Sequence, residues 1–166
     1  MADYQLTSST AILRVLDGVL IPADSNNRDF IAYQAWLAIA GNHPAPVLPP
    51  ILTPQQQFDA ALANGVNTIW TTSTTLNNLY AIDSQMQFNI TAESVMILTS
   101  GTFSTGATTR FWPTQSSVPM PMNLAQFKAF AMAISTYVNS LYAVLAAKQA
   151  GQTNTPWPNN QITINA

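Results

Sequence analysis

The chain has 166 residues, of which 48% are hydrophobic and only 7% are charged, with five Lys or Arg against seven Asp or Glu. An average soluble protein carries about 25% charged residues, so the polar character of this chain comes from Asn, Gln, Ser and Thr instead. So few cations exclude a basic surface that could neutralise a nucleic-acid backbone. The absence of cysteine excludes disulfides and cysteine-bound metal ions.

This polar composition has a physical consequence. Uncharged amides and hydroxyls cost less to desolvate than ions, and neutral hydrogen bonds across an interface can satisfy them. The composition therefore favours a subunit that neighbouring proteins cover, with a secreted or simply low-charge protein as the alternative. No apolar run approaches the roughly 20 residues that span a bilayer. The N-terminus has no cationic region followed by an apolar stretch, so neither a membrane segment nor a signal peptide is predicted.

The first predicted elements are short. Residues 11–16 and 19–21 are rich in β-forming side chains and flank Asp17-Gly18, a strong hairpin signal, which predicts a two-stranded β-ribbon. A short helix follows, with capping oxygens at residues 26–29 and its end at Gly41. Its apolar face consists of Phe30, Tyr33, Trp36, Leu37 and Ala40.

Prolines then dominate residues 43–52, which predicts a stiff, extended linker and the clearest boundary in the chain. A second helix is expected to begin at Thr53, with Pro54 in its first turn, and to end at Asn64-Gly65. The alternating, β-rich residues 66–72 predict a short strand.

The rest of the chain is mainly helical in its pattern. Asp83 can cap a third helix that runs to about Leu98. A β-hairpin is predicted over residues 108–122, where the prolines confine its strands to a sheet edge. A capping box of Asn123 and Gln126 then begins the longest helix.

Together these elements predict an α+β fold in four parts. Residues 1–42 form a β-ribbon with a short helix that docks to other subunits, and residues 43–52 form the proline-rich linker. Residues 53–151 form a mainly helical domain with a β-hairpin and one long helix. Residues 152–166 form an extended tail with a short strand signal near its end.

Two stretches of the chain carry distinctive residue patterns. The first consists of Val15-Leu16-Asp17-Gly18, Ile21-Pro22-Ala23-Asp24, Asn27-Arg28-Asp29-Phe30, Tyr33, Trp36-Leu37 and Gly41-Asn42-His43-Pro44-Ala45-Pro46. It resembles a segment common in tail-fibre-associated proteins of phages and prophages. The second consists of Leu79-Tyr80-Ala81-Ile82-Asp83-Ser84, Gly101-Thr102-Phe103, Phe111-Trp112-Pro113, Gln126-Phe127 and Tyr137-Val138. It is similar to small phage and prophage tail-region proteins that carry a DUF4376-like domain.

The resemblance implies a role in the virion or in tail assembly, and it supplies no catalytic residues. This chain departs from the second pattern in one place. The family often has a glycine between the hairpin strands, where this chain has Gln115-Ser116-Ser117.

Signals of catalysis are missing from the sequence. His43 is the only histidine, so a multi-histidine metal site cannot form, and no Gly-x-Ser-x-Gly elbow presents a serine. The acids are dispersed, with Asp17 in a turn and Asp29 and Asp83 at helix starts, so no carboxylate pair of a glycosidase is indicated. The glycines occur singly and form no phosphate-binding loop. We therefore expect no enzyme activity, no metal and no cofactor.

Aromatic side chains are the remaining candidates for function, because Trp and Tyr are enriched at protein interfaces. Packing within the chain and stacking on sugar rings are the alternatives for the same residues. The candidate interface residues are Tyr33, Trp36, Trp70, Trp112 and Trp157.

The sequence therefore predicts a structural component of a bacteriophage tail, associated with the tail fibre or tail tip. It is expected in the virion, and in the host cytoplasm during assembly. The expected partners are other phage tail proteins and further copies of this chain, a trimer by analogy with phage fibres. Neither nucleic acid nor membrane is an expected partner. Two alternatives stay open: an assembly chaperone of the tail fibre that is absent from the mature virion, and a tip protein that binds a host-surface glycan.

Overall fold

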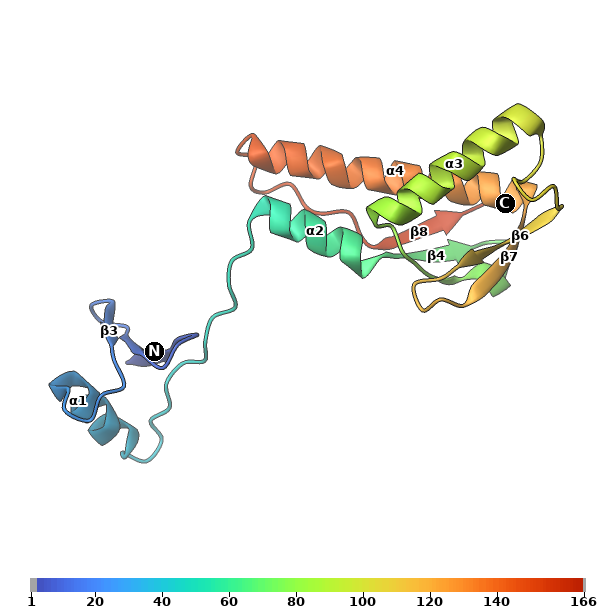
Figure 1. Ribbon diagram of the computed structural model, residues 1–166. Helices are drawn as coiled ribbons and strands as arrows, with labels where there is room; N and C mark the ends of the chain where they lie inside the picture. Colours follow the sequence, from blue (N-terminus) through green and yellow to red (C-terminus); the bar gives the residue numbers. More distant parts are fainter. Residues whose placement is uncertain (1–2, 166) are drawn as a thin grey trace. The chain divides into compact units, whose positions relative to one another are not determined.

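The computed structural model describes residues 3–165 and divides the chain into two compact units, Met1–Ile51 and Leu52–Ala166 (Figure 1). Within the described residues there are four α-helices and eight strands, with 41% of residues helical and 20% in strands. The fold class is therefore mixed α+β, as predicted, with strands at the N-terminus and a long helix near the C-terminus.

The first unit contains a three-stranded antiparallel sheet of β1 (Tyr4–Leu6), β2 (Ile12–Arg14) and β3 (Val19–Ile21), in that spatial order. The predicted ribbon had only two strands, which correspond to β2 and β3. The structure adds a third, because β1 pairs with the free edge of β2. Tyr4 pairs with Arg14 in that register. Three residues without a flanking turn signal are too short a pattern to predict.

Helix α1 (Arg28–Leu37) lies beside this sheet and begins where predicted. Its predicted end at Gly41 is wrong, because the helix stops at Leu37 with Ala38 as its C-cap, so Ala40 lies outside it. The side chain of Asn27 caps it by accepting hydrogen bonds from the backbone N–H groups of Asp29 at 2.8 Å and Phe30 at 3.2 Å. Arg14 then ties the hairpin turn to the helix, because its guanidinium pairs with Asp17 at 2.8 Å and with Asp29 at 3.3 Å.

Four side chains form the core of the first unit: Tyr4, Ile12, Ile21 and Tyr33. Aromatic contacts dominate this core, since the ring of Tyr4 meets those of Tyr33 at 5.1 Å and Trp36 at 4.9 Å. So small a unit buries only a modest fraction of its surface, and its independent stability is correspondingly low.

The boundary between the units falls after Ile51, inside the segment 43–52 that the prolines mark. The segment begins attached to the first unit, because Ala45 exchanges two backbone hydrogen bonds of 2.8 Å with β1, through Leu6 N–H and Tyr4 C=O. Residues 46–53 form neither helix nor strand.

The second unit is built on a three-stranded sheet in the order β5-β4-β8. Its strands are β4 (Val66–Trp70), β5 (Asn78–Tyr80) and β8 (Gln161–Ile164). Strand β8 runs parallel to β4, with Trp70 opposite Ile164. The strand signal predicted near the end of the extended tail is therefore confirmed, but residues 161–164 are an integral strand of this unit and not part of a free tail.

Helices cover this sheet, and a separate hairpin packs at its edge. Helix α2 (Pro54–Asn64), α3 (Ser84–Ser100) and α4 (Leu124–Gln149) begin at the predicted caps Thr53, Asp83 and Asn123, and a short 3-10 turn, η1, spans Thr74–Leu76. The hairpin consists of β6 (Thr109–Pro113) and β7 (Pro119–Asn123). In its turn Ser117 adopts a positive φ of 63°, the backbone conformation that a glycine would adopt more easily.

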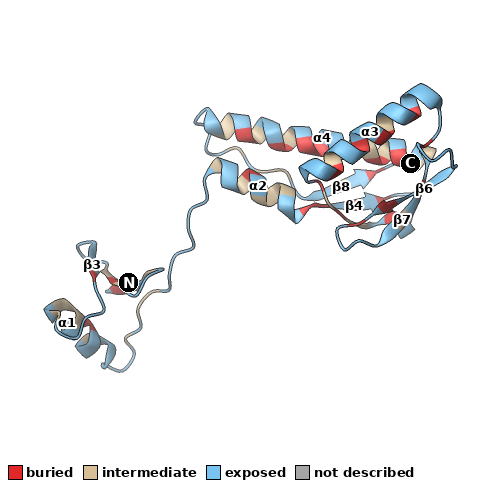
Figure 2. Cartoon of the chain, viewed as in Figure 1, coloured by how far each residue is buried: buried red, intermediate tan, exposed pale blue. Residues whose placement is uncertain are grey.

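Helix α4 is the centre of the hydrophobic core of the second unit. Its buried stripe, red in Figure 2, consists of Phe127, Phe130, Ile134, Tyr137, Val138, Leu141 and Leu145. By length and composition alone α4 is also apolar enough to cross a membrane, with a mean hydropathy of 1.4 over an 18-residue window of which 33% is buried. The sequence interpretation missed this property. It is weak evidence for a membrane, because the core helix of a soluble protein meets the same criteria.

Replacing Gly65 with alanine is expected to lower the free energy of unfolding by about 2 kcal/mol. Gly65 ends α2 with a φ of +71°, and an added Cβ would lie 2.6 Å from the backbone oxygen of Tyr80 and would also collide with the side chain of Gln115. Gly101→Ala is the matched control, since its φ is +74° but nothing lies within 4 Å of the added Cβ. Urea denaturation should show a clearly smaller loss for Gly101→Ala; equal losses would contradict the steric argument.

Candidate interaction surface

The structure places three of the five candidate interface residues inside the protein. Only 1% of Trp70, 3% of Trp112 and 7% of Tyr33 is exposed, so these three pack within the chain, which is the alternative that the sequence left open for them. Strand alternation explains Trp70, because β4 turns Val66, Thr68 and Trp70 inward together.

Trp112 is held in the core by packing. Its ring lies 5.0 Å from that of Phe127 and 6.3 Å from that of Phe130, and Arg110 lies over it at 5.8 Å. Within the described residues its ring N–H finds no hydrogen-bond partner. A ring so enclosed offers no free face to a partner protein or to a sugar.

Trp36 and Trp157 are half-buried and are tied to their own units. The ring N–H of Trp36 donates to a carboxylate oxygen of Asp3 at 2.8 Å, and that of Trp157 donates to the amide oxygen of Gln57 at 2.6 Å. Both donors are therefore satisfied within the chain. The Trp36 contact holds the N-terminal strand region against α1, and the Trp157 contact holds the C-terminal segment against α2.

A buried ion pair that the sequence interpretation did not foresee lies in the second unit. Glu93, on α3, is only 4% exposed, and its carboxylate accepts hydrogen bonds from the backbone N–H of Ser104 at 2.7 Å and the Ser104 hydroxyl at 2.9 Å. Arg110, on β6, completes the cluster by pairing with the same carboxylate. Because the three residues come from a helix, a loop and a strand, they fasten the loop after α3 to the helix and the hairpin.

This cluster makes stability depend on pH. Burial acts to raise the pKa of Glu93, but the hydrogen bonds from Ser104 and the charge of Arg110 outweigh it, so the pKa lies below the ordinary 4.5. A lowered pKa in the folded state means that the stabilisation is present at neutral pH and is lost as the pH falls below about 4.5.

Between pH 5 and pH 3 the wild type is therefore expected to lose more stability than Glu93→Gln, which cannot titrate at this position. Thermal unfolding followed by tryptophan fluorescence at each pH measures the difference. The comparison cancels the contribution of Asp17, whose pKa is also lowered by its hydrogen bonds to Arg14. Parallel pH profiles for the two proteins would contradict the assignment.

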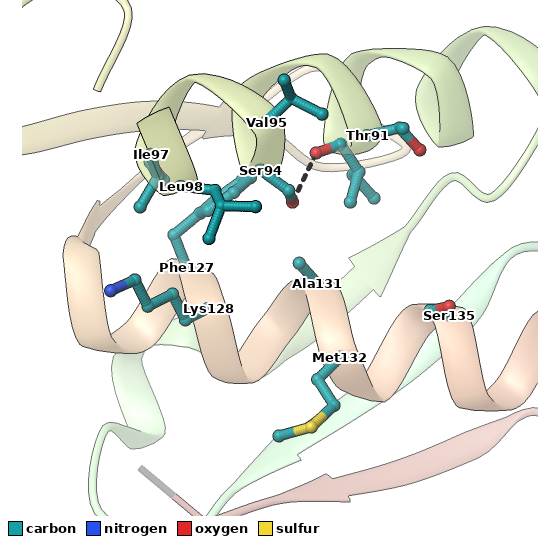
Figure 3. Close-up of a pocket in the computed structure, with 11 residues that line it drawn as sticks. Thr91, Ser94, Val95, Ile97, Leu98, Phe127, Lys128, Ala131, Met132 and Ser135 are labelled. Carbon is teal, nitrogen blue, oxygen red and sulfur yellow. Dashed lines mark hydrogen bonds between the residues drawn. The ribbon is translucent and has the colours of Figure 1, made fainter. Parts of the chain in front are cut away.

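A hollow of about 630 Å³ lies between α3 and α4 (Figure 3). Its lining is mainly aliphatic and includes Val95, Leu98, Phe127, Lys128, Ala131 and Met132. We call it the α3–α4 groove. Leu98 is 85% and Met132 70% exposed, so apolar side chains stand at its mouth. Among the described residues that line it, Lys128 is the one that carries a charge.

The exposed face of α3 extends this apolar character. Its large apolar side chains in contact with solvent are Phe88, Val95, Met96 and Leu98. Glu93 is the one charged residue in the 17-residue helix, and it points into the core. The solvent-facing side of α3 thus combines apolar groups with neutral polar groups, which favours contact with another protein surface.

In the described part of the chain, few side chains are placed to bind a metal ion or to support catalysis. No group of three or more His, Cys, Asp or Glu residues lies close enough to hold a metal ion within residues 3–165. His43 is exposed beside the proline-rich segment, and Glu93 is paired with a cation instead of a second acid. The α3–α4 groove and the exposed face of α3 are therefore the candidate functional surface. The hydrophobic pattern of α3 could have revealed it, because Phe88, Val95 and Leu98 fall outside the buried row 86, 90, 93 and 97.

Comparisons of the chain with protein-family models, with curated proteins and with solved structures each found no match. The resemblance to phage tail-region proteins therefore stays a prediction from the sequence.

Proposed function

We propose that this chain is a structural component of a bacteriophage tail, associated with the tail fibre or tail tip, and that it acts through protein–protein interfaces. The observation that carries the proposal is the exposed face of α3 with the adjoining groove, where apolar side chains meet solvent and ions are scarce. A free protein would gain solubility from charges at these positions, whereas a subunit covered by neighbours gains from their absence.

The first unit supports the same proposal. It has four buried side chains in its core, while Leu16 is 92%, Leu20 62% and Ile39 60% exposed. A unit with so little core and so much exposed apolar surface gains stability when it docks to another subunit. The residues that resemble tail-fibre-associated proteins lie in this same unit. The exposed apolar surface and the resemblance therefore both support the proposed role.

Mass spectrometry of purified phage particles tests the proposal directly. The chain is expected at a fixed copy number relative to the tail-tube protein, and that ratio should survive repeated density-gradient purification. Presence in infected-cell lysate together with absence from purified particles would overturn the structural role and favour the assembly chaperone. A non-structural phage protein that is abundant in the lysate serves as the control for carry-over.

A further inference from the structure

The segment 46–52 joins the two units, but its exposed aliphatic side chains are more typical of a peptide that binds an apolar groove than of a spacer. Spacers keep small or polar side chains in water, but here Val47, Leu48, Ile51 and Leu52 are all exposed, Leu48 by 71% and Ile51 by 98%. The sequence contains no Asp, Glu, Lys or Arg between Asp29 and Asp59. This segment therefore presents an uncharged aliphatic surface to solvent.

Its backbone is free to bind as well. Within the described residues none of the four N–H groups in this segment donates a hydrogen bond. Prolines at positions 46, 49 and 50 favour the polyproline II conformation, which has three residues per turn. At that period Leu48 and Ile51 lie on the same edge, about 9 Å apart. The two most exposed side chains of the segment thus form one apolar edge on a backbone that loses little entropy when it binds.

The α3–α4 groove has the complementary chemistry. It is open and aliphatic, carries a single lysine among its described lining residues, and has the volume of a typical ligand cleft. A charged or strongly polar ligand would leave its ions unpaired there. An uncharged aliphatic segment brings no ion that must be desolvated, and it removes the exposed Leu98 and Met132 from water.

The length of chain between this segment and α2 decides whether the segment can enter the α3–α4 groove of its own chain or that of a second copy. Helix α2 packs on the C-terminal half of α4, with the rings of Phe58 and Tyr142 4.8 Å apart, and its first residue lies toward the C-terminal end of α4 (Figure 1). From Tyr142, Ala131 in the groove lies about 16 Å back along α4, and Pro54 lies about 6 Å in the opposite direction. Three residues before Pro54, Ile51 can reach at most about 11 Å. Even Ser135, the lining residue of α4 nearest to Tyr142, lies about 10 Å back along the helix, so Ile51 cannot enter the groove of its own chain. Leu48 and Ile51 can therefore bind there together only in a second copy.

We propose that residues 46–52 of one copy bind in the α3–α4 groove of a second copy, with Leu48 and Ile51 as the anchoring side chains. The segment and the groove are different surfaces, so the contact closes either as a reciprocal pair or as a ring of copies. This inference goes beyond the proposed tail role and is tested without reference to it.

Engineered cysteines test the contact in the full chain, because the natural sequence contains none. An Ile51→Cys chain and a differently tagged Leu98→Cys chain are mixed and oxidised, and disulfide-linked heterodimers are counted by mass. The matched control replaces Leu98→Cys by Phe88→Cys, which is on the same helix, is 67% exposed and does not line the groove. We expect at least a several-fold higher heterodimer yield with Leu98→Cys. Equal yields, or no heterodimer with either, would overturn the proposal.

Sedimentation equilibrium of cysteine-free variants provides the second readout. The wild type is expected to associate as its concentration rises, and Ile51→Ser should weaken that association by about tenfold or more, as expected for loss of one buried aliphatic side chain. Ile51 is almost fully exposed, so its replacement should leave the fold intact. Phe88→Ser is expected to associate like the wild type. A wild type that stays monomeric, or an Ile51→Ser protein that associates unchanged, contradicts the contact even if the chain proves to be a tail component.

Discussion

Replacing Arg110 with alanine is expected to lower the free energy of unfolding of the second unit by about 3 kcal/mol, the lower end of the range for breaking a buried ion pair. Glu93 is nearly inaccessible to water and would keep its charge with only the hydrogen bonds from Ser104. The lower end applies because the side chain of Arg110 is 32% exposed, so water already screens part of the pair.

Urea denaturation at pH 7 measures this loss, and two further variants locate its cause. The double variant Glu93→Gln with Arg110→Met should recover much of the stability, because no buried charge is left without a partner. Lys128→Ala removes an exposed cation from the same unit and should change stability by less than about 0.5 kcal/mol. An Arg110→Ala protein as stable as the Lys128→Ala protein would show that the ion pair has no structural role.

Local sequence signals were sufficient for the starts of the helices. The caps Asn27, Thr53, Asp83 and Asn123 each precede the helix that they were expected to begin, because a capping oxygen and the following apolar period act within a few residues. The hairpin β6–β7 was predictable for the same reason, since its strands flank their own turn. The α+β class follows from these elements.

Non-local pairing was not predictable from the sequence. Strand β8 pairs with β4 across more than 90 residues, as Trp70 opposite Ile164 shows, and no spacing rule encodes such a partner. Glu93 and Arg110 are 17 residues apart on different elements, so no helical spacing rule of i, i+3 or i, i+4 could join them. Strands β1 and β5 have three residues each, too few for a periodic pattern, and they lack the hairpin signal that made the equally short β2 and β3 predictable.

The sequence left the role of the aromatic residues open for a physical reason. Tryptophan is enriched both at interfaces and in cores, so its identity alone does not distinguish the two. The alternation of β4 did contain the answer for Trp70, because Val66, four positions earlier on the same face, marks that face as buried. The exposed face of α3 instead presents Phe88, Val95, Met96 and Leu98, three of which are not aromatic.

A single substitution distinguishes an integral strand from a free tail at the C-terminus. Ile164→Ala is expected to lower the free energy of unfolding by about 3 kcal/mol, the usual cost of truncating a buried isoleucine. Ile164 is 2% exposed and belongs to the core of the second unit, and its carbonyl accepts a hydrogen bond from Thr71 N–H at 3.1 Å.

Thr163→Ala is the matched control, because Thr163 lies one position earlier in the same strand with its side chain exposed. Its replacement should change stability by less than about 0.5 kcal/mol, since the backbone pairing with β4 stays intact. Denaturant titration of the two variants therefore separates side-chain burial from backbone pairing. If Ile164→Ala is as stable as Thr163→Ala, residues 161–164 contribute no core packing and behave as part of a free tail.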